Sequence, residues 1–345
     1  MIDMKSVKTE EAVGQVLCHD VTQIIKGVVK DAVFRKGHII SASDIPLLLS
    51  LGKDHVYIWE KRDGMLHEDE AAEILRQICQ GANMHPTPPK EGRIELIADI
   101  DGLFIVDVER LRAINSLGEI IIATRTSSIP VKKGDKLCGM RVVPLVIDEK
   151  KMDQARQVAG NEPLLRLLPF HAKKYGLITT GNEVFYNRIK DTFSPVIREK
   201  MAKYGCEMLE HRILDDNHEK ITAAINEMLT AGAEMVFCTG GMSVDPDDKT
   251  PLAIKNTGAC IVSYGAPVLP GSMFLIAYTE NSRPICGLPG CIMYEGYTIF
   301  DLVLPLLLAD VPVTPKWLAG LGNGGLCLNC PECRYPNCMF GKGSI

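Results

Sequence analysis

The stretch that decides the fold of this chain runs from Met235 to Thr250 and reads MVFCTGGMSVDPDDKT. Met235–Cys238 is short and entirely apolar, which predicts a buried strand. Pro251 follows Thr250, and a capping residue before proline is typical of a helix start. A strand, a glycine-rich loop and a helix in this order indicate an α/β sheet, where ligands bind beyond the carboxyl ends of the strands.

The loop between that strand and that helix combines glycines, hydroxyls and carboxylates. Gly240 and Gly241 let the backbone approach a ligand closely, and free N–H groups at a helix start attract an anion. The loop also holds three carboxylates, which would repel an anion unless a cation or a donor-rich ligand lay between them. Mg²⁺ with a phosphate fits this pattern, and so does a pterin ring. A solvated acidic turn that only caps the helix is the alternative.

The same alternation of elements extends over residues 174–312. Leu177–Thr179 and Met208–Leu214 predict further strands. Ser194 before Pro195 predicts a helix cap, and Asp216 opens a capping-box pattern before another helix. The predicted fold class is therefore α/β, a three-layer, mostly parallel sheet with helices on both faces. A smaller β-rich or α+β region is expected before it.

Composition and charge narrow the class of protein. Of the 345 residues, 46% are hydrophobic and 23% are charged, which suits a globular chain with a sizeable core. The net charge of −5 without a basic stripe predicts no nucleic-acid partner. The longest apolar stretch, 299–313, is interrupted by Asp301, Pro305 and Asp310, so no membrane span is expected. The N-terminus lacks the pattern of a signal peptide, and a cytoplasmic location is expected.

Four more loops complete a recognisable series of motifs. In chain order the series is Thr180-Gly181-Asn182-Glu183, Asp215-Asp216, Thr239-Gly240-Gly241-x-Ser243 with Asp248, Pro270-Gly271, and Gly287-Leu288-Pro289-Gly290. This order resembles the molybdenum-cofactor biosynthesis domain, and most closely the MoeA-like molybdopterin molybdenumtransferases. Val13–Val21 and Phe34–Gly52 are similar to N-terminal segments of those enzymes.

The resemblance implies a function and a site. The function is insertion of molybdate into adenylylated molybdopterin, with Mg²⁺-assisted cleavage of the adenylyl phosphoanhydride. By position, the catalytic residues would be Glu183, Asp216 and Asp248. The residues implied in cofactor binding are Thr180, Gly181, Glu183, Asp215, Gly240, Gly241, Ser243, Asp247, Asp248, Thr250, Pro270, Gly271, Pro289 and Gly290. Related enzymes often dimerise, so a homodimer is a further expectation.

Two departures from the family pattern keep other functions open. Cys291-Ile292 follows Gly290 where the family has Asn-Pro, and Ser272-Met273 follows Gly271 where the family has Lys-Pro. Both changes favour a non-catalytic carrier or chaperone that holds the cofactor for a molybdoenzyme. A nucleotide hydrolase of the competence-damage type is the third hypothesis.

The predicted domains follow from these patterns: a MoeA-like segment over 1–62, a helix and proline-rich linker over 63–92, an inserted β-rich module with a connecting helix over 93–173, the molybdopterin-binding domain over 174–312, and a tail over 313–345. The tail carries four closely spaced cysteines, Cys327, Cys330, Cys333 and Cys338. Their spacing predicts a metal site, either an iron–sulfur cluster or tetrahedral Zn²⁺. We hypothesise that this tail docks on, or senses, an iron–sulfur molybdoenzyme.

Overall fold

The computed structural model describes residues 6–25, 29–58, 63–243, 245–246 and 248–343. The chain forms two compact units. The first comprises residues 1–97, 107–125 and 136–165, and the second comprises residues 98–106, 126–135 and 166–345. These units interleave along the sequence, and the five consecutive segments described above stay a prediction. Within the described ranges, no helix is both long and apolar enough to cross a membrane.

The first unit begins with small antiparallel elements around a core that includes Leu17, Phe34 and Leu48. Strand β1 (Ser6–Lys8) pairs with β4 (His55–Tyr57), and β2 (Val21–Ile25) pairs with β3 (Val29–Phe34). The helical turns of this part are η1 (Thr9–Glu11) and α1 (Ile45–Ser50). The small β-rich or α+β region expected before the cofactor domain is therefore present.

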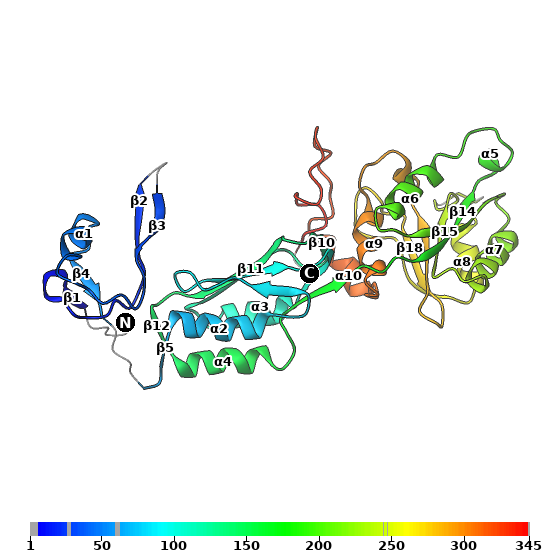
Figure 1. The fold of residues 1–345 in the computed structure, drawn as a ribbon. Helices are drawn as coiled ribbons and strands as arrows, with labels where there is room; N and C mark the ends of the chain where they lie inside the picture. Colours follow the sequence, from blue (N-terminus) through cyan, green and yellow to red (C-terminus); the bar gives the residue numbers. More distant parts are fainter. Residues whose placement is uncertain (1–5, 26–28, 59–62, 244, 247, 344–345) are drawn as a thin grey trace. The chain divides into compact units, whose positions relative to one another are not determined.

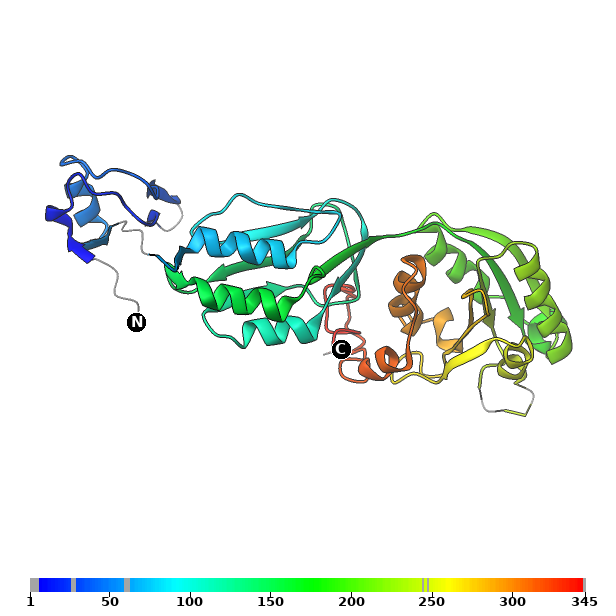
Figure 2. The ribbon, with the colours of Figure 1, turned by 90° about the horizontal axis from the view of Figure 1, so that it is seen from below.

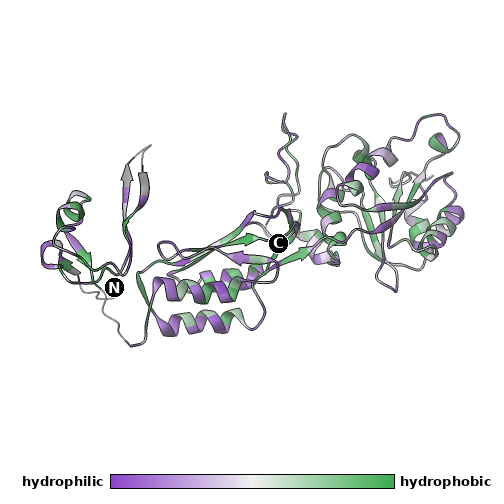
Figure 3. Ribbon diagram, in the orientation of Figure 1, coloured by the Kyte–Doolittle hydropathy of each residue, from purple (hydrophilic) through white to green (hydrophobic). Residues whose placement is uncertain are grey.

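The rest of the first unit is an antiparallel sheet with helices. The sheet order is β6 (Met84–Pro86), β7 (Ile94–Ala98), β11 (Lys136–Val142) and β9 (Ile120–Thr124), and β5 (Met65–His67) pairs with β12 (Val146–Asp148). The helices α2 (Glu68–Cys79), α3 (Val108–Asn115) and α4 (Glu149–Ala159) lie side by side (Figure 2). Figure 3 shows polar and apolar residues alternating along α2 and α4, as expected for helices with one buried face.

The second unit is built on a six-stranded sheet (Figure 1). Its order is β15 (Glu207–Leu214), β14 (Lys174–Thr180), β16 (Met235–Thr239), β19 (Pro284–Leu288), β18 (Leu275–Tyr278) and β17 (Cys260–Tyr264). The first four strands are parallel, and the last two are antiparallel additions. A second, three-stranded sheet has the order β10 (Ile129–Val131), β8 (Gly102–Val106) and β13 (Leu165–Pro169).

Alternate residues of the parallel strands enter two separate cores because side chains point to opposite faces of a sheet. In β16, Phe237 packs with α6 (Phe193–Ala202) and α9 (Ile299–Leu308). Its neighbours Val236 and Cys238 pack with α7 (His218–Thr230) and α8 (Thr250–Asn256). The remaining helices are α5 (Asn182–Phe185), η2 (Gly290–Met293) and α10 (Pro315–Gly320). The predicted α/β fold class is confirmed.

Candidate functional site

The predicted motifs meet because the register of the large sheet aligns the ends of its strands. Thr180 of β14 pairs with Leu214 of β15, and Thr239 of β16 pairs with Leu288 of β19. In the antiparallel strands, Leu275 lies opposite both Gly287 and Tyr264. The segments 181–192, 215–217, 240–249, 265–274 and 289–298 therefore all leave or enter the sheet at this one edge, which we call the carboxyl edge.

The loop Thr239–Thr250, called here the glycine–threonine loop, is fixed at its two ends by buried hydroxyls. The Oγ1 atoms of Thr180 and Thr250 lie 3.1 Å apart, and Thr250 Oγ1 donates to the carbonyl oxygen of Gly240 at 2.9 Å. Thr180 and Thr250 are at most 1% exposed. Their hydroxyls therefore hold the two ends of the loop against the end of β14.

The two glycines of this loop leave no room for a side chain. Gly240 has a φ of +83°, and a Cβ there would lie 2.1 Å from the carbonyl oxygen of Thr180. Gly241 has a φ of +55°, and its Cβ would lie 3.0 Å from Thr250 Oγ1. Glycine adopts such conformations without the steric cost of a side chain. The sequence predicted that these glycines let the backbone approach a ligand; the structure shows in addition that Gly240 lies close against the end of β14.

Two of the predicted acidic residues lie beside the end of β14. Asp216 Oδ2 accepts a hydrogen bond of 2.9 Å from the backbone N–H of Asn182. Glu183 is exposed on α5, and its carboxylate folds back over Gly181, where an added Cβ would lie 2.7 Å from Glu183 Oε1. Asp216 thus joins the loop after β15 to the loop after β14, while Glu183 faces solvent.

Asp215 is oriented differently from its neighbour. Its Oδ2 accepts from Lys220 Nζ at 2.7 Å. Its Oδ1 is buried and has no hydrogen-bond partner within the part of the chain that the structure describes. A buried carboxylate oxygen is costly to leave unpaired. Asp215 can therefore accept a further hydrogen bond or bind a cation through Oδ1.

Asp248 lies at the far end of the acidic turn. It is half-buried, its N–H donates to Asp245 O at 3.0 Å, and its Oδ2 accepts from Asp245 N at 3.4 Å. Tyr264 at the end of β17 donates to the carbonyl oxygens of Met242 and Ser243. Burial, and then the charge of Asp248, raise the pKa of Tyr264.

The predicted residue Asp247 lies outside the described residues, and the Ser243 side chain is exposed.

The proline and glycine motifs support the same edge. Gly271 has a φ of +121°, and a Cβ there would lie 2.6 Å from Ile299 Cγ2 at the start of α9. Pro270 O accepts from Ile299 N at 3.3 Å. Pro289 precedes η2, and Gly290 begins it with open space at its Cβ position. Pro270 and Gly271 therefore fix the start of α9, whereas Gly290 leaves space open.

Three predicted helix caps are wrong. Asp191 Oδ1, not Ser194, accepts from the first N–H groups of α6. Asn217, not Asp216, caps α7. Lys249 occupies the cap position of α8, and the Thr250 hydroxyl donates to Gly240 O. For α6 and α7 a neighbouring polar side chain caps the helix. For α8 the hydroxyl of the expected capping residue makes a tertiary hydrogen bond.

The sequence did not predict a pairing of Asp191 and His211 beside this edge. His211 Nε2 lies 3.0 Å from Thr179 Oγ1 and 3.6 Å from Asp191 Oδ2, and Asp191 Oδ2 is buried without a hydrogen bond in the described residues. Burial is the main cause that lowers the pKa of His211, and the Asp191 charge opposes it. The sequence carried no distinctive signal for this pairing, since β15 also contains Glu210 and Arg212 next to His211.

The predicted metal ligands are not gathered. Among the described residues, no group of three or more His, Cys, Asp or Glu side chains is close enough to hold a metal ion. This includes Cys327, Cys330, Cys333 and Cys338, which are free thiols. At the carboxyl edge, the described carboxylates therefore form no ready-made cage of three protein ligands.

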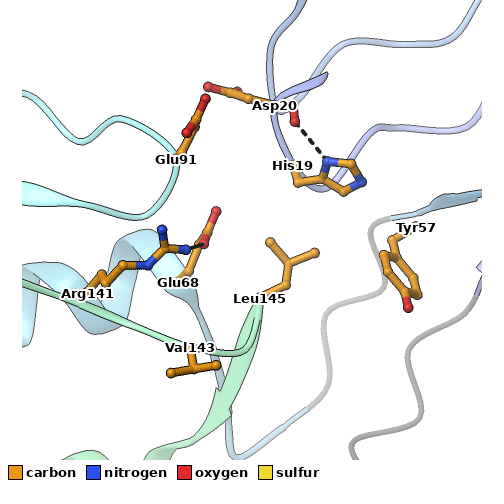
Figure 4. Close-up of a pocket in the computed structure, with 8 residues that line it drawn as sticks. All are labelled: His19, Asp20, Tyr57, Glu68, Glu91, Arg141, Val143 and Leu145. Atoms are coloured by element: carbon orange, nitrogen blue, oxygen red, sulfur yellow. Dashed lines mark hydrogen bonds and ion pairs between the residues drawn. The ribbon is translucent and has the colours of Figure 1, made fainter. Parts of the chain in front are cut away.

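A separate pocket of about 420 Å³ lies within the first unit (Figure 4). Its charged residues include Glu68, which is 7% exposed and lies 3.6 Å from Arg141, and Glu91, which accepts from Thr22 at 2.7 Å. Burial and the Asp69 charge raise the pKa of Glu68. The lining residues are His19, Asp20, Tyr57, Glu68, Glu91, Arg141, Val143 and Leu145. No sequence motif could have predicted it, because these residues are scattered and none belongs to the predicted site.

Two family models match the chain. Residues 176–309 match a family described as "Probable molybdopterin binding domain". Residues 6–60 match a domain of unknown function. The first match covers the large sheet together with every loop of the carboxyl edge.

Curated relatives share part of the chain. The molybdopterin molybdenumtransferase of Synechococcus elongatus is 25% identical over 191 residues, which are 52% of this chain and 45% of that protein. A protein of Bacillus anthracis named "Putative competence-damage inducible protein" is 30% identical over 129 residues, which are 36% of this chain and 30% of that protein. The chain therefore spans less than half the length of these relatives.

Two of the similar solved structures are named as proteins of tungsten or molybdenum cofactor synthesis. The tungsten cofactor synthesizing protein MoaB from Pyrococcus furiosus is 20% identical, with a TM-score of 0.31 over 35% of this chain and 84% of that one. Another Pyrococcus furiosus structure, a molybdenum cofactor biosynthesis protein, is 14% identical, with a TM-score of 0.26 over 90% of this chain and 66% of that one. The α/β domain therefore matches the family described as a probable molybdopterin binding domain over residues 176–309, which are less than half of the chain.

Proposed function

We propose that the carboxyl edge binds adenylylated molybdopterin and that the protein inserts molybdate into it as the adenylyl phosphoanhydride is cleaved. The observation that carries this proposal is the register of the sheet, which brings five motif-bearing segments to one edge. The match of residues 176–309 to the molybdopterin-binding family adds to it. Ligands of α/β sheets bind at such an edge.

The glycine–threonine loop is the element suited to the phosphates. Gly240 and Gly241 present backbone without side chains, and the exposed Ser243 adds a hydroxyl donor. The ends of the loop, with Gly240, are held in place before any ligand arrives, since Thr180 and Thr250 join them to β14. A preformed loop loses little conformational entropy on binding, which favours affinity.

The carboxylates are suited to the pterin ring and to the cleavage step. Glu183 is exposed and Asp248 is half-buried, so both can accept hydrogen bonds from pterin N–H groups or a proton from an attacking water. Asp216 positions the Asn182 N–H and with it the turn that carries Glu183. We assign Glu183 and Asp248 to the chemistry and Asp216 to positioning that turn.

Mg²⁺ is compatible with these donors when the substrate completes its coordination. Mg²⁺ usually keeps several waters and binds one or two carboxylates together with substrate phosphates, so it does not need a three-ligand protein cage. The unpartnered Oδ1 of Asp215 is a hard oxygen donor of the required kind. Asp215 would hold the ion together with substrate phosphates and waters, and the ion would offset negative charge on the phosphoanhydride.

The competing proposal is a non-catalytic carrier of the cofactor. Ser272-Met273 follows Gly271, so the lysine expected there to meet an anion is missing, and Cys291 follows Gly290 in place of asparagine. A carrier would use the same edge for binding but would leave the phosphoanhydride intact. The two proposals therefore differ in turnover and agree on binding.

The test gives the purified full chain adenylylated molybdopterin, Mg²⁺ and molybdate, and measures AMP release. Asp248→Asn should lower the rate at least about 100-fold, the scale of removing a general base. Glu280→Gln is the matched control, because Glu280 is exposed in the turn between β18 and β19, away from the carboxyl edge.

The outcomes separate the proposals. AMP release that is lost in Asp248→Asn and kept in Glu280→Gln supports the transferase. Tight binding of the substrate without AMP release supports the carrier. Cleavage of nucleotide substrates with no affinity for molybdopterin would instead support a hydrolase like the competence-damage relatives.

A further inference from the structure

The segment 327–338, called here the cysteine loop, carries four thiols that the proposed function does not use. The spacings Cys327-x2-Cys330-x2-Cys333-x4-Cys338 place them within twelve residues. All four are free thiols that are partly or fully exposed. By contrast, Cys79, Cys138, Cys238 and Cys286 are buried in the cores, where burial raises the pKa of Cys238 to about 12.

Both ends of the cysteine loop are tied to the folded domain by backbone hydrogen bonds. At the start, Cys327 N donates to Leu269 O at 2.8 Å, and Leu269 N donates to Gly325 O at 2.8 Å. After the loop, Gly341 N donates to Gly324 O at 3.0 Å. The chain that precedes the thiols and the chain that follows them are therefore held side by side.

Aromatic residues anchor the chain between and after the thiols. Phe340 is 4% exposed in the core beneath α9. Tyr335 OH donates to Asp301 O at 3.2 Å, and its ring lies 4.3 Å from that of Tyr297. These contacts restrict the loop to a small region of the domain, whereas no helix or strand within 327–338 fixes its own backbone.

We propose that Cys327, Cys330, Cys333 and Cys338 bind one metal centre through four thiolates. Three residues span at most about 11 Å, so neighbouring thiols can reach a common centre by backbone rotation within the loop. The thiols are apart in the structure, and the metal would draw them together. Because the loop is already closed at both ends, much of the entropy of closing it is lost before the metal binds.

The centre is an iron–sulfur cluster or a single zinc ion. The repeated Cys-x2-Cys-x2-Cys spacing is near that of cluster-binding runs, while four thiolates also satisfy tetrahedral Zn²⁺. Each thiol releases its proton to solvent as it binds, and no oxidation is needed for zinc. The resulting negative charge lies in a loop that also contains Arg334, and Lys342 follows the loop in the sequence.

The cysteine loop meets the carboxyl edge through Leu269. Leu269 pairs with Leu326 and precedes Pro270-Gly271, the motif that contacts the start of α9. Ordering of the loop by a metal would therefore act directly on a segment of the proposed cofactor site. Metal binding itself does not depend on that function.

The experiment purifies the full chain without oxygen and measures iron, acid-labile sulfide and zinc per chain. Two variants are compared with the wild type. The first replaces the exposed pair, Cys330→Ser with Cys333→Ser, and should lose the metal. The control, Cys260→Ser, removes an exposed cysteine elsewhere and should keep it.

The readouts also test the geometry. Apo protein titrated with Co²⁺ alone should develop the absorption of a tetrathiolate complex at one ion per chain, and the double variant should not. Gly341→Ala should weaken Co²⁺ binding roughly 10-fold or more, because its Cβ would lie 2.4 Å from Leu302 Cδ2 and displace the closing contact.

Iron with sulfide or one zinc ion per chain, lost in the double variant, supports the site and identifies the metal. A wild-type protein with no metal and no cobalt complex overturns the proposal. Equal metal content in the wild type and the double variant also overturns it. Circular dichroism of the double variant confirms folding, and molybdopterin binding measured in parallel distinguishes failure here from failure of the proposed function.

Discussion

The glycine–threonine loop and the cysteine loop lie in the same domain but are held in opposite ways. The first is fixed from within, by the buried Thr180–Thr250 contact and by glycines whose Cβ positions are occupied by neighbouring atoms. The second is fixed at its ends and by aromatic anchors, and its thiols remain apart.

The difference teaches how each loop is suited to its ligand. A loop with buried, satisfied polar groups is organised before binding and can discriminate by shape. A loop closed at its ends but irregular inside gains its final structure from the ligand, as metal sites often do. The first loop should therefore be sensitive to added atoms, and the second to loss of its sulfur ligands.

The largest expected contrast is in thiol reactivity. In metal-free protein, Cys330 and Cys333 should be alkylated at least about 10³-fold faster than Cys238 and Cys286, which react only when the domain opens. Both core thiols are 0% exposed, and burial raises their pKa values. Mass spectrometry of timed alkylation checks this, and equal rates would contradict the assigned core.

The next effect concerns added atoms in the glycine–threonine loop. Gly240→Ala should weaken molybdopterin binding roughly 10- to 100-fold, or about 1.4–2.8 kcal/mol, because its Cβ would meet Thr180 O. Gly258→Ala is the matched control, since Gly258 has nearly the same φ, +82°, with nothing within 4 Å of its Cβ position. Isothermal titration measures both, and equal losses would show that backbone strain alone matters.

A smaller effect is expected from the buried hydroxyls. Thr250→Val leaves Gly240 O and the Thr180 hydroxyl without their partner, which should lower the free energy of unfolding by about 1–3 kcal/mol. Thr230→Val removes an exposed hydroxyl on α7 and should change it by less than about 0.5 kcal/mol. Urea unfolding compares the two, and a neutral Thr250→Val would contradict the locking role.

The smallest expected effect is a pH dependence from His211. Burial lowers the pKa of His211 in the folded state, so the unfolded chain binds this proton more readily. The wild-type free energy of unfolding should therefore fall as the pH drops from above the ordinary imidazole value of about 6.5 toward the lower folded pKa. His211→Gln should flatten this slope in urea titrations, and an unchanged slope would remove His211 as a contributor.

The sequence predicted the parts of the α/β domain that depend on local pattern. Apolar runs such as Met235–Cys238 became central strands, and the glycine-rich loop follows β16 as expected. The convergence of Thr180, Asp216 and Gly240 at one edge was predictable because parallel strands share a direction.

Tertiary contacts explain what the sequence could not predict. The Thr250 hydroxyl bonds Gly240 O across the loop and does not cap its helix, and Asp191 pairs with His211, which lies far from it in the sequence. The helix Val108–Asn115 interrupts a region with strand-like composition. Local propensity carries no information about such contacts.

The most direct test of the central claim is equilibrium binding of molybdopterin to the full chain without oxygen, followed by pterin fluorescence. The account predicts saturable binding of one molybdopterin per chain, lost or strongly weakened in Gly240→Ala and kept in Gly258→Ala. Absence of binding to the wild-type protein, or undiminished binding to a folded Gly240→Ala variant, would contradict the assignment of the carboxyl edge as the molybdopterin site.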